Sequence, residues 1–264
     1  MGMQLEYIAV DWSGAAVGAH KTIWLARCVG NTLVELENGL SRERVADRLV
    51  EHARRNPNIV LGLDFAFSMP IWFIREHNIS CCDELWDFVA SNGENWLRSC
   101  QPPFWGRPGR HRPELPEHYR WTEKEVGSVK GINAKSVFQI FGAGAVGTGS
   151  LRGMPFLSKL RREGFSIWPF DSSCLPCAIE IYPRLLTGPV KKNDQGEREK
   201  YLRESLPDLN LAFREKASRS DDAFDAAVSA LVMSKHLVNP LLQLRHSTDE
   251  RILLEGRIWQ PASV

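Results

Sequence analysis

Nearly continuous apolar runs at the start of the chain predict three strands before the first helix. The segment LEYIAVD (residues 5–11) is apolar almost throughout, which is typical of a central strand covered on both faces. The segments KTIWLARC (21–28) and TLVEL (32–36) flank a short Val-Gly-Asn connection that suits a tight turn. We therefore expect these three segments to form an antiparallel meander.

The polar pattern changes after residue 40, where a helix and a fourth strand are predicted. Ser41 is a suitable N-cap, and apolar residues recur every four positions in the segment 42–55, as in an amphipathic helix. The β-branched, apolar run IVLGLD (59–64) follows. A preceding helix can return such a strand parallel to the first one.

Periodicity weakens between about residues 68 and 150, so this part is expected to be an insertion after the fourth strand. Its segment 101–121 is rich in proline, glycine and arginine, which predicts an ordered loop. Strand-like and helical patterns then resume at CAIEIYP (177–183) and in a strong final helix at 220–237. The charged run between them, at 191–200, is expected to be a solvated linker.

The length and the order of these elements fit one α/β domain over residues 1–264, with a mixed sheet of five strands or slightly more and helices on both faces. A formal net charge of +1 gives no general basic field, so a nucleic-acid partner would need a local patch. No apolar run is long enough to cross a bilayer, and the six cysteines favour a reduced, cytoplasmic setting with free thiols. Cys174 and Cys177 lead into a strand without a second cysteine pair, so neither a redox nor a zinc site is expected. The oligomeric state is left open.

Two predicted strands end at an aspartate, Asp11 in VDWSG and Asp64 in GLDFAF. If these strands are parallel neighbours, their axes lie about 4.8 Å apart and the two carboxylates share one edge of the sheet. Two anions so close repel unless a cation neutralises them, and carboxylate oxygens suit Mg²⁺ or Mn²⁺. Each aspartate could instead be a simple turn former.

Three more carboxylates come from the second half of the chain. Glu180 lies between apolar residues of a predicted strand, and Asp222 and Asp225 lie three apart on one face of the final helix. A structural role is open for each: Glu180 could pair with an arginine such as Arg184. Asp221 and Asp222 could serve the helix dipole alone.

Five segments carry a resemblance to a known family: VDWSG, GLDFAFSMP, PPFWGRP, AIEIYP and SDDAFDAAVSAL. They resemble the landmarks of the prokaryotic domain of unknown function 429 family, whose members are described as predicted nucleases with an RNase H-like fold. The resemblance covers nearly the whole chain. The segment DDAFDAAVSA is also similar to the closing segment of Holliday-junction resolvases, although Asp64 stands where those enzymes place a glutamate. The resemblance implies an RNase H-like fold.

Such a cluster predicts hydrolysis of phosphodiester bonds with two Mg²⁺ or Mn²⁺ ions about 3.5 to 4 Å apart. The expected metal ligands are Asp11, Asp64, Glu180, Asp222 and Asp225, and all but Glu180 are also expected to be catalytic. The nucleic acid, DNA or RNA, is expected to contact Ser13, Trp105, Arg107, Arg110 and Arg112. The arginines and aromatic residues of this loop could instead pack it onto the domain.

A glycine pattern supports a competing interpretation, a dinucleotide site. Gly142, Gly144 and Gly147 form G-x-G-x-x-G, and Asp171 follows at nearly the distance of a ribose-binding acid. Such a site needs a helix that begins within the glycines. We expect Gly149 and the residues after it to delay the helix to about residue 151, which disfavours this interpretation.

Two other functions stay open. RNase H-like architecture is shared with actin-like kinases and ATPases, and the turn Asp11-Ser13-Gly14 could bind a phosphate of ATP with Mg²⁺. Those proteins usually duplicate the fold, for which this chain is too short. A non-catalytic nucleic-acid-binding module is the other alternative.

Overall fold

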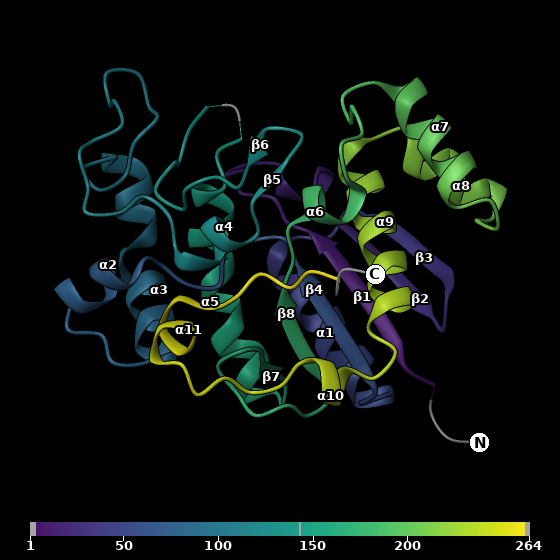
Figure 1. The fold of residues 1–264 in the computed structure, drawn as a ribbon, viewed down its shortest axis with the longest axis horizontal. Coiled ribbons are helices and arrows are strands. Elements are labelled where there is room, and N and C mark those ends of the chain that lie inside the picture. The colour runs from purple at the N-terminus through teal and green to yellow at the C-terminus, as the bar shows by residue number, and fades with distance from the viewer. Residues whose placement is uncertain (1–3, 143, 262–264) are drawn as a thin grey trace.

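A mixed sheet of six strands, in the order β3-β2-β1-β4-β8-β7, forms the centre of the fold (Figure 1). The computed structural model describes residues 4–142 and 144–261. The strands of this sheet are β1 (Glu6–Asp11), β2 (Trp24–Val29), β3 (Thr32–Asn38), β4 (Ile59–Leu63), β7 (Ser166–Ile167) and β8 (Cys177–Glu180). A separate small hairpin pairs β5 (Ser128–Val129) with β6 (Ile132–Asn133).

The pairing of the strands confirms the predicted meander and the predicted parallel return. β1 pairs with β2 and β2 with β3, both antiparallel. β4 lies parallel to β1 on its other side, and β8 and β7 continue the parallel half of the sheet. The carboxyl ends of β1, β4 and β8 therefore meet at one edge.

Helices cover both faces of this sheet (Figure 1). Those described are η1 (Ala19–Lys21), α1 (Arg42–Arg55), α2 (Ile71–Glu76), α3 (Cys82–Ser99), α4 (Trp121–Glu125), α5 (Gly147–Arg162), α6 (Pro183–Thr187), α7 (Gln195–Ser205), α8 (Leu211–Ser218), α9 (Asp221–His236), α10 (Pro240–Gln243) and α11 (Glu250–Glu255). Side chains alternate along β1, so that Ile8 and Val10 join the core beneath α1, α3 and α5. Tyr7 and Ala9 join the core beneath α9 on the opposite face.

The expected insertion is more regular than its weak periodicity indicates. α3 is an 18-residue helix within it, and its residues Leu85, Trp86 and Val89 are buried in the main core against α5. The pattern of residues 83–99 allows a short helix, and α3 is longer than that expectation. Within the expected insertion, irregular chain is confined mainly to residues 100–142 and 144–146.

Two expectations about helix starts are wrong. α5 begins at Gly147 rather than near residue 151, and α7 begins at Gln195 inside the expected linker, where Asp194 caps it by accepting from Gly196 N and Glu197 N. Glycine serves close packing in α5: a Cβ on Gly147 would lie 2.1 Å from the carbonyl oxygen of Val137. Tertiary packing outweighs the low helix propensity of these glycines.

Within the described ranges, the structure holds no helix that combines the length and the apolar character needed to span a membrane.

Candidate functional site

The parallel register of β1 and β4 brings two aspartates together. Val10 lies opposite Leu63, and the amide of Asp64 donates a hydrogen bond of 3.1 Å to the carbonyl oxygen of Val10. Asp11 and Asp64 are therefore the next residues at the same edge of the sheet. Because side chains alternate, Asp11 shares the face of Tyr7 and Ala9, which is the face that α9 covers.

α9 supplies two more carboxylates from the other side of this edge. Ser220 caps the helix by accepting from the amide of Ala223, which fixes where the helix begins. Asp222 lies in the first turn. Asp225 lies one turn further in, where only 8% of its surface is exposed. Together, Asp11, Asp64, Asp222 and Asp225 form the carboxylate cluster.

Burial gives these carboxylates unusual proton affinities. Removal from water raises the pKa of Asp11 well above its ordinary value, and the negative charges of the other three members raise it further. Burial also raises the pKa of Asp64 to about 7 and that of Asp222 to about 6. The negative charge of Asp225 raises the pKa of Asp64 further. The cluster therefore holds more negative charge than its surroundings readily accommodate.

A lysine supplies part of the missing positive charge. Lys192 Nζ contacts Asp225 Oδ2. The other oxygen, Asp225 Oδ1, is buried without a hydrogen-bond partner among the described residues. Hard oxygen donors in this number suit Mg²⁺ or Mn²⁺, and the orphaned oxygen needs a proton or a cation. The donor chemistry therefore fits such an ion.

The side chains do not form a finished metal site. In the part of the chain that the structure describes, no group of three or more His, Cys, Asp or Glu side chains is arranged to hold a metal ion. The contact with Lys192 occupies one carboxylate oxygen of Asp225. Binding of an ion through that oxygen would need this contact to change.

Glu180 does not join the carboxylate cluster. It pairs in register with Leu63, one residue before the edge of the sheet, so it shares the other face with Ala178. Arg120 Nη1 donates to Glu180 Oε2 over 2.9 Å, Arg120 Nη2 donates to Oε1 over 2.5 Å, and the amide of Phe67 also donates to Oε2. Both oxygens are engaged, so we remove Glu180 from the proposed ligands. The arginine partner is Arg120 and not Arg184.

Arg120 is the centre of a buried ionic network. Its side chain is 1% exposed and also contacts Glu123, with Nη2 to Oε1 at 2.6 Å, and the carbonyl oxygen of Glu255. Burial raises the pKa of Glu123 despite the arginine beside it. One guanidinium thus serves two buried carboxylates, a structural role that joins α4 to β8.

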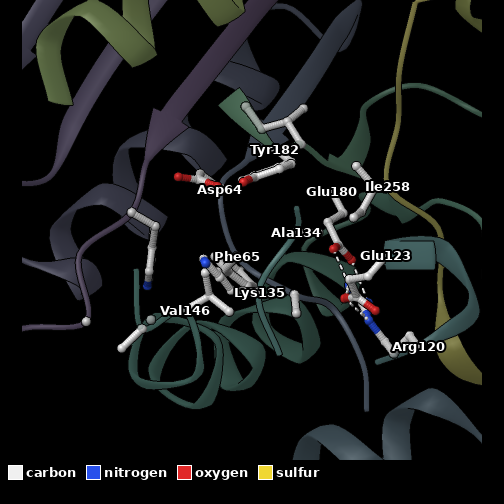
Figure 2. Close-up of a pocket in the computed structure, with 16 residues that line it drawn as sticks. Asp64, Phe65, Arg120, Glu123, Ala134, Lys135, Val146, Glu180, Tyr182 and Ile258 are labelled. Carbon is white, nitrogen blue, oxygen red and sulfur yellow. Dashed lines mark hydrogen bonds and ion pairs between the residues drawn. The ribbon is translucent and has the colours of Figure 1, made fainter. Parts of the chain in front are cut away.

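A cavity of about 170 Å³ lies beside the carboxylate cluster. Figure 2 shows Asp64 at one end with the Tyr182 side chain pointing toward it, and Arg120, Glu123 and Glu180 together at the other end. Lys135 and the start of α5 form a further wall. Asp64 is the member of the carboxylate cluster that lines this cavity, and Lys135 lines it as well.

Ser13 and Gly14, expected to contact a nucleic acid or ATP, make several contacts with other residues of the protein. Ser13 Oγ accepts from Thr22 Oγ1 over 2.7 Å, and Arg42 Nε donates to the Ser13 carbonyl. A Cβ on Gly14 would lie 2.5 Å from the amide nitrogen of Gly149. The turn after β1 therefore packs against the start of α5, and Gly14 also lines the cavity.

The arginine-rich segment is exposed and attached near the cavity. Arg107, Arg110 and Arg112 are exposed, and none forms an ion pair with another described residue. Arg112 lies over the rings of Trp105 and Tyr119, at 5.9 and 5.7 Å from the ring centroids. The amide of Trp105 donates to Phe138, in the chain that leads to Lys135 and α5. Trp105 therefore orients Arg112 and anchors the loop.

The structure disfavours the dinucleotide interpretation because of Asp171, the expected ribose-binding acid. The other requirement, a helix that begins within the glycine pattern, is met. α5 does begin at the third glycine of the pattern, against our expectation. Asp171 is engaged, however, because Arg161 Nε donates to it over 3.0 Å and the amide of Ile167 over 2.8 Å. Ala143, within the glycine pattern, lies outside the described residues.

The cysteines Cys174 and Cys177 are free thiols, as expected, and burial raises the pKa of Cys177 to about 12.

Three residues near the site were not predicted from the sequence: Lys192, Tyr182 and Arg120. Lys192 stood in a charged run that resembles a solvated linker, and Arg120 in a proline-rich loop. Tyr182 lies two residues after Glu180, beyond the end of β8, where alternation along the strand no longer predicts the direction of a side chain.

The raised pKa values predict that the metal-free protein is more stable in mild acid than in mild base. The pKa values of Asp64 and Asp222, about 7 and about 6, exceed the ordinary value of 3.8. Between about pH 4 and pH 7 the folded state binds protons that the unfolded state releases, so the free energy of unfolding should fall as pH rises. Melting temperatures measured with EDTA across this range should decline.

The matched control for this pH series is Asp64→Asn, which cannot titrate and should decline less steeply. Identical pH profiles for the wild type and Asp64→Asn would contradict the assignment.

Comparison of the chain with protein-family models, with curated proteins and with solved structures found no match.

Proposed function

We propose that this protein is a nuclease with an RNase H-like fold that hydrolyses phosphodiester bonds with the help of Mg²⁺ or Mn²⁺. The observation that carries the proposal is the convergence of the carboxylate cluster. Asp11 ends β1, Asp64 follows β4, and Asp222 and Asp225 come from α9, more than 150 residues later in the chain. Four carboxylates that are partly or fully removed from water repel one another, which favours a cation-binding role for the cluster.

The order of elements supports the fold in this proposal. An antiparallel meander, a helix and a parallel strand at the other side of β1 are followed by a late helix that carries acids. The same order underlies the resemblance to predicted nucleases that the sequence motifs carry. The six free cysteines support the proposed cytoplasmic setting.

Asp11, Asp64 and Asp225 would hold the metal, with Asp222 beside them. When bound, Mg²⁺ or Mn²⁺ supplies Lewis-acid activation of water and neutralises charge at the phosphate. The protein's own part is to bind and orient. Asp11, on the central strand, interacts with Asp64 and with both aspartates of α9, and protons held by the cluster would leave as the cation enters.

Cationic side chains near the cavity would hold the rest of the nucleic acid. Lys135 lines the cavity itself, and the exposed Arg107, Arg110 and Arg112 can contact phosphates outside it. Because Arg112 covers Trp105, we propose an orienting role for this indole and not an open stacking surface.

Cleavage assays test the proposal directly. Single-stranded, duplex, branched and RNA–DNA hybrid substrates should be incubated with the protein and Mg²⁺ or Mn²⁺, and with EDTA as the control. We expect cleavage of at least one substrate that EDTA abolishes. Cleavage that persists in EDTA would contradict the metal role. Binding without cleavage of any substrate would favour the non-catalytic module, and ATP turnover without nucleic acid would favour the kinase alternative.

A further inference from the structure

Lys192 stands out because a charged side chain from a surface loop reaches a buried acidic site. Its Nζ contacts Asp225 Oδ2, and its side chain is only 15% exposed. A buried ammonium is unfavourable unless it is paired. The contact therefore fixes where Lys192 lies.

The charge of Lys192 acts on the whole carboxylate cluster and not on Asp225 alone. It interacts favourably with the negative charge of each of the four aspartates. Lys192 therefore already supplies, at the carboxylate cluster, part of the positive charge that a second metal ion would bring. A divalent ion there would meet the repulsion of the ammonium or have to displace it.

The backbone that carries Lys192 is fixed from two sides. Arg198, which is 5% exposed, donates from Nη1 to the carbonyl oxygen of Lys192 and from Nε to that of Ser218, just before α9. Arg184 donates from Nη1 to the carbonyl oxygens of Gly188, over 3.1 Å, and Val190, over 2.7 Å. The lysine is thus held at the site by an anchored loop between α6 and α7.

We propose that Lys192 is a built-in cation that takes the place of a second metal ion, so that the site binds one divalent ion and one ammonium group. The inference rests on the proposed nuclease function and revises its expected pair of ions. With Asp225 engaged by a metal ion, the ammonium of Lys192 would be free to donate a hydrogen bond to a non-bridging oxygen of a bound phosphate. A lysine suits this role as a compact point charge with three donors.

The number of Mn²⁺ ions bound, measured by isothermal titration calorimetry without nucleic acid, tests the inference. The wild type should bind one ion at the carboxylate cluster. Lys192→Met should bind two ions, because the space and the charge of the ammonium are gone. Lys192→Arg, which keeps the charge, should bind one. The control is Lys191→Met, because Lys191 is exposed in the same loop and forms no ion pair with a described residue.

Cleavage provides a second readout on the same proteins. Lys192→Met should cleave about 100-fold more slowly than the wild type, as expected for loss of one charge that acts on the reacting phosphate, and Lys191→Met should match the wild type. Two ions on the wild type with cleavage intact would overturn the inference and leave the nuclease proposal standing. No ion on the wild type would overturn both. An unchanged single ion on folded Lys192→Met would also overturn the inference.

Discussion

Replacement of Asp11 by Asn should reduce metal-dependent cleavage by at least about 1000-fold, which corresponds to the several kcal/mol of charge stabilisation that a catalytic metal ion supplies. The substitution keeps the shape of the side chain and removes its charge. Asp11 lies on the central strand and interacts with every other member of the carboxylate cluster. Loss of its charge should therefore weaken the binding of the metal ion and shift the position of any ion that still binds.

The matched control is Asp221→Asn. Asp221 begins α9 beside Asp222 but is exposed to solvent. The Asp221→Asn variant should cleave at nearly the wild-type rate, because the charge of Asp221 interacts mainly with the helix dipole. Equal cleavage by Asp11→Asn and the wild type would show that the carboxylate cluster is not the catalytic site. Melting curves of both variants confirm that each is folded.

Replacement of Arg120 by Met should lower the free energy of unfolding by about 3 to 5 kcal/mol, the usual effect of removing one partner from a buried ion pair. The reason is that Glu180 and Glu123, 4% and 5% exposed, would both lose the only cationic partner that they have among the described residues. Urea denaturation of the variant and the wild type measures the difference. Arg107→Met, at an exposed arginine without a described ion pair, should be close to neutral.

A second substitution separates this structural role from a metal role. Glu180→Gln in the Arg120→Met background should recover part of the lost stability, because it removes one of the stranded charges. Glu180→Gln alone should leave the affinity for Mn²⁺ unchanged, since both carboxylate oxygens of Glu180 accept hydrogen bonds from Arg120. A large loss of Mn²⁺ affinity in this variant would return Glu180 to the ligand set.

The strand order and the two strand-end aspartates could be predicted because both depend on local patterns. Continuous apolar runs mark β1 and β4, and a helix between two strands favours a parallel return. The position of Asp225 followed from its place one turn into an amphipathic helix. These features need no knowledge of how distant segments pack.

Glu180 was misassigned because its face depends on register. Side chains change face at every residue, so a shift of one position moves a carboxylate from the side of α9 to the side of α5. The pairing of Leu63 with Glu180 settles the face, and no pattern within AIEIYP specifies that pairing.

The cations of the site were missed for a related reason. Lys192 and Arg120 lie in segments whose composition is typical of solvated chain, and each has a partner far away in the sequence. Lys192 meets Asp225 33 positions away, and Arg120 meets Glu180 60 positions away. Composition describes the average environment of a loop and not the one side chain that turns inward.

Crystals of the wild-type protein soaked in Mn²⁺ provide the most direct test of the claim that distant acids jointly bind a hard cation. An anomalous difference map should show an ion contacted by carboxylate oxygens of Asp11, Asp64 and Asp225, with Lys192 displaced from Asp225. A map at saturating Mn²⁺ in which Lys192 still contacts Asp225 and no ion lies between the aspartates would contradict it.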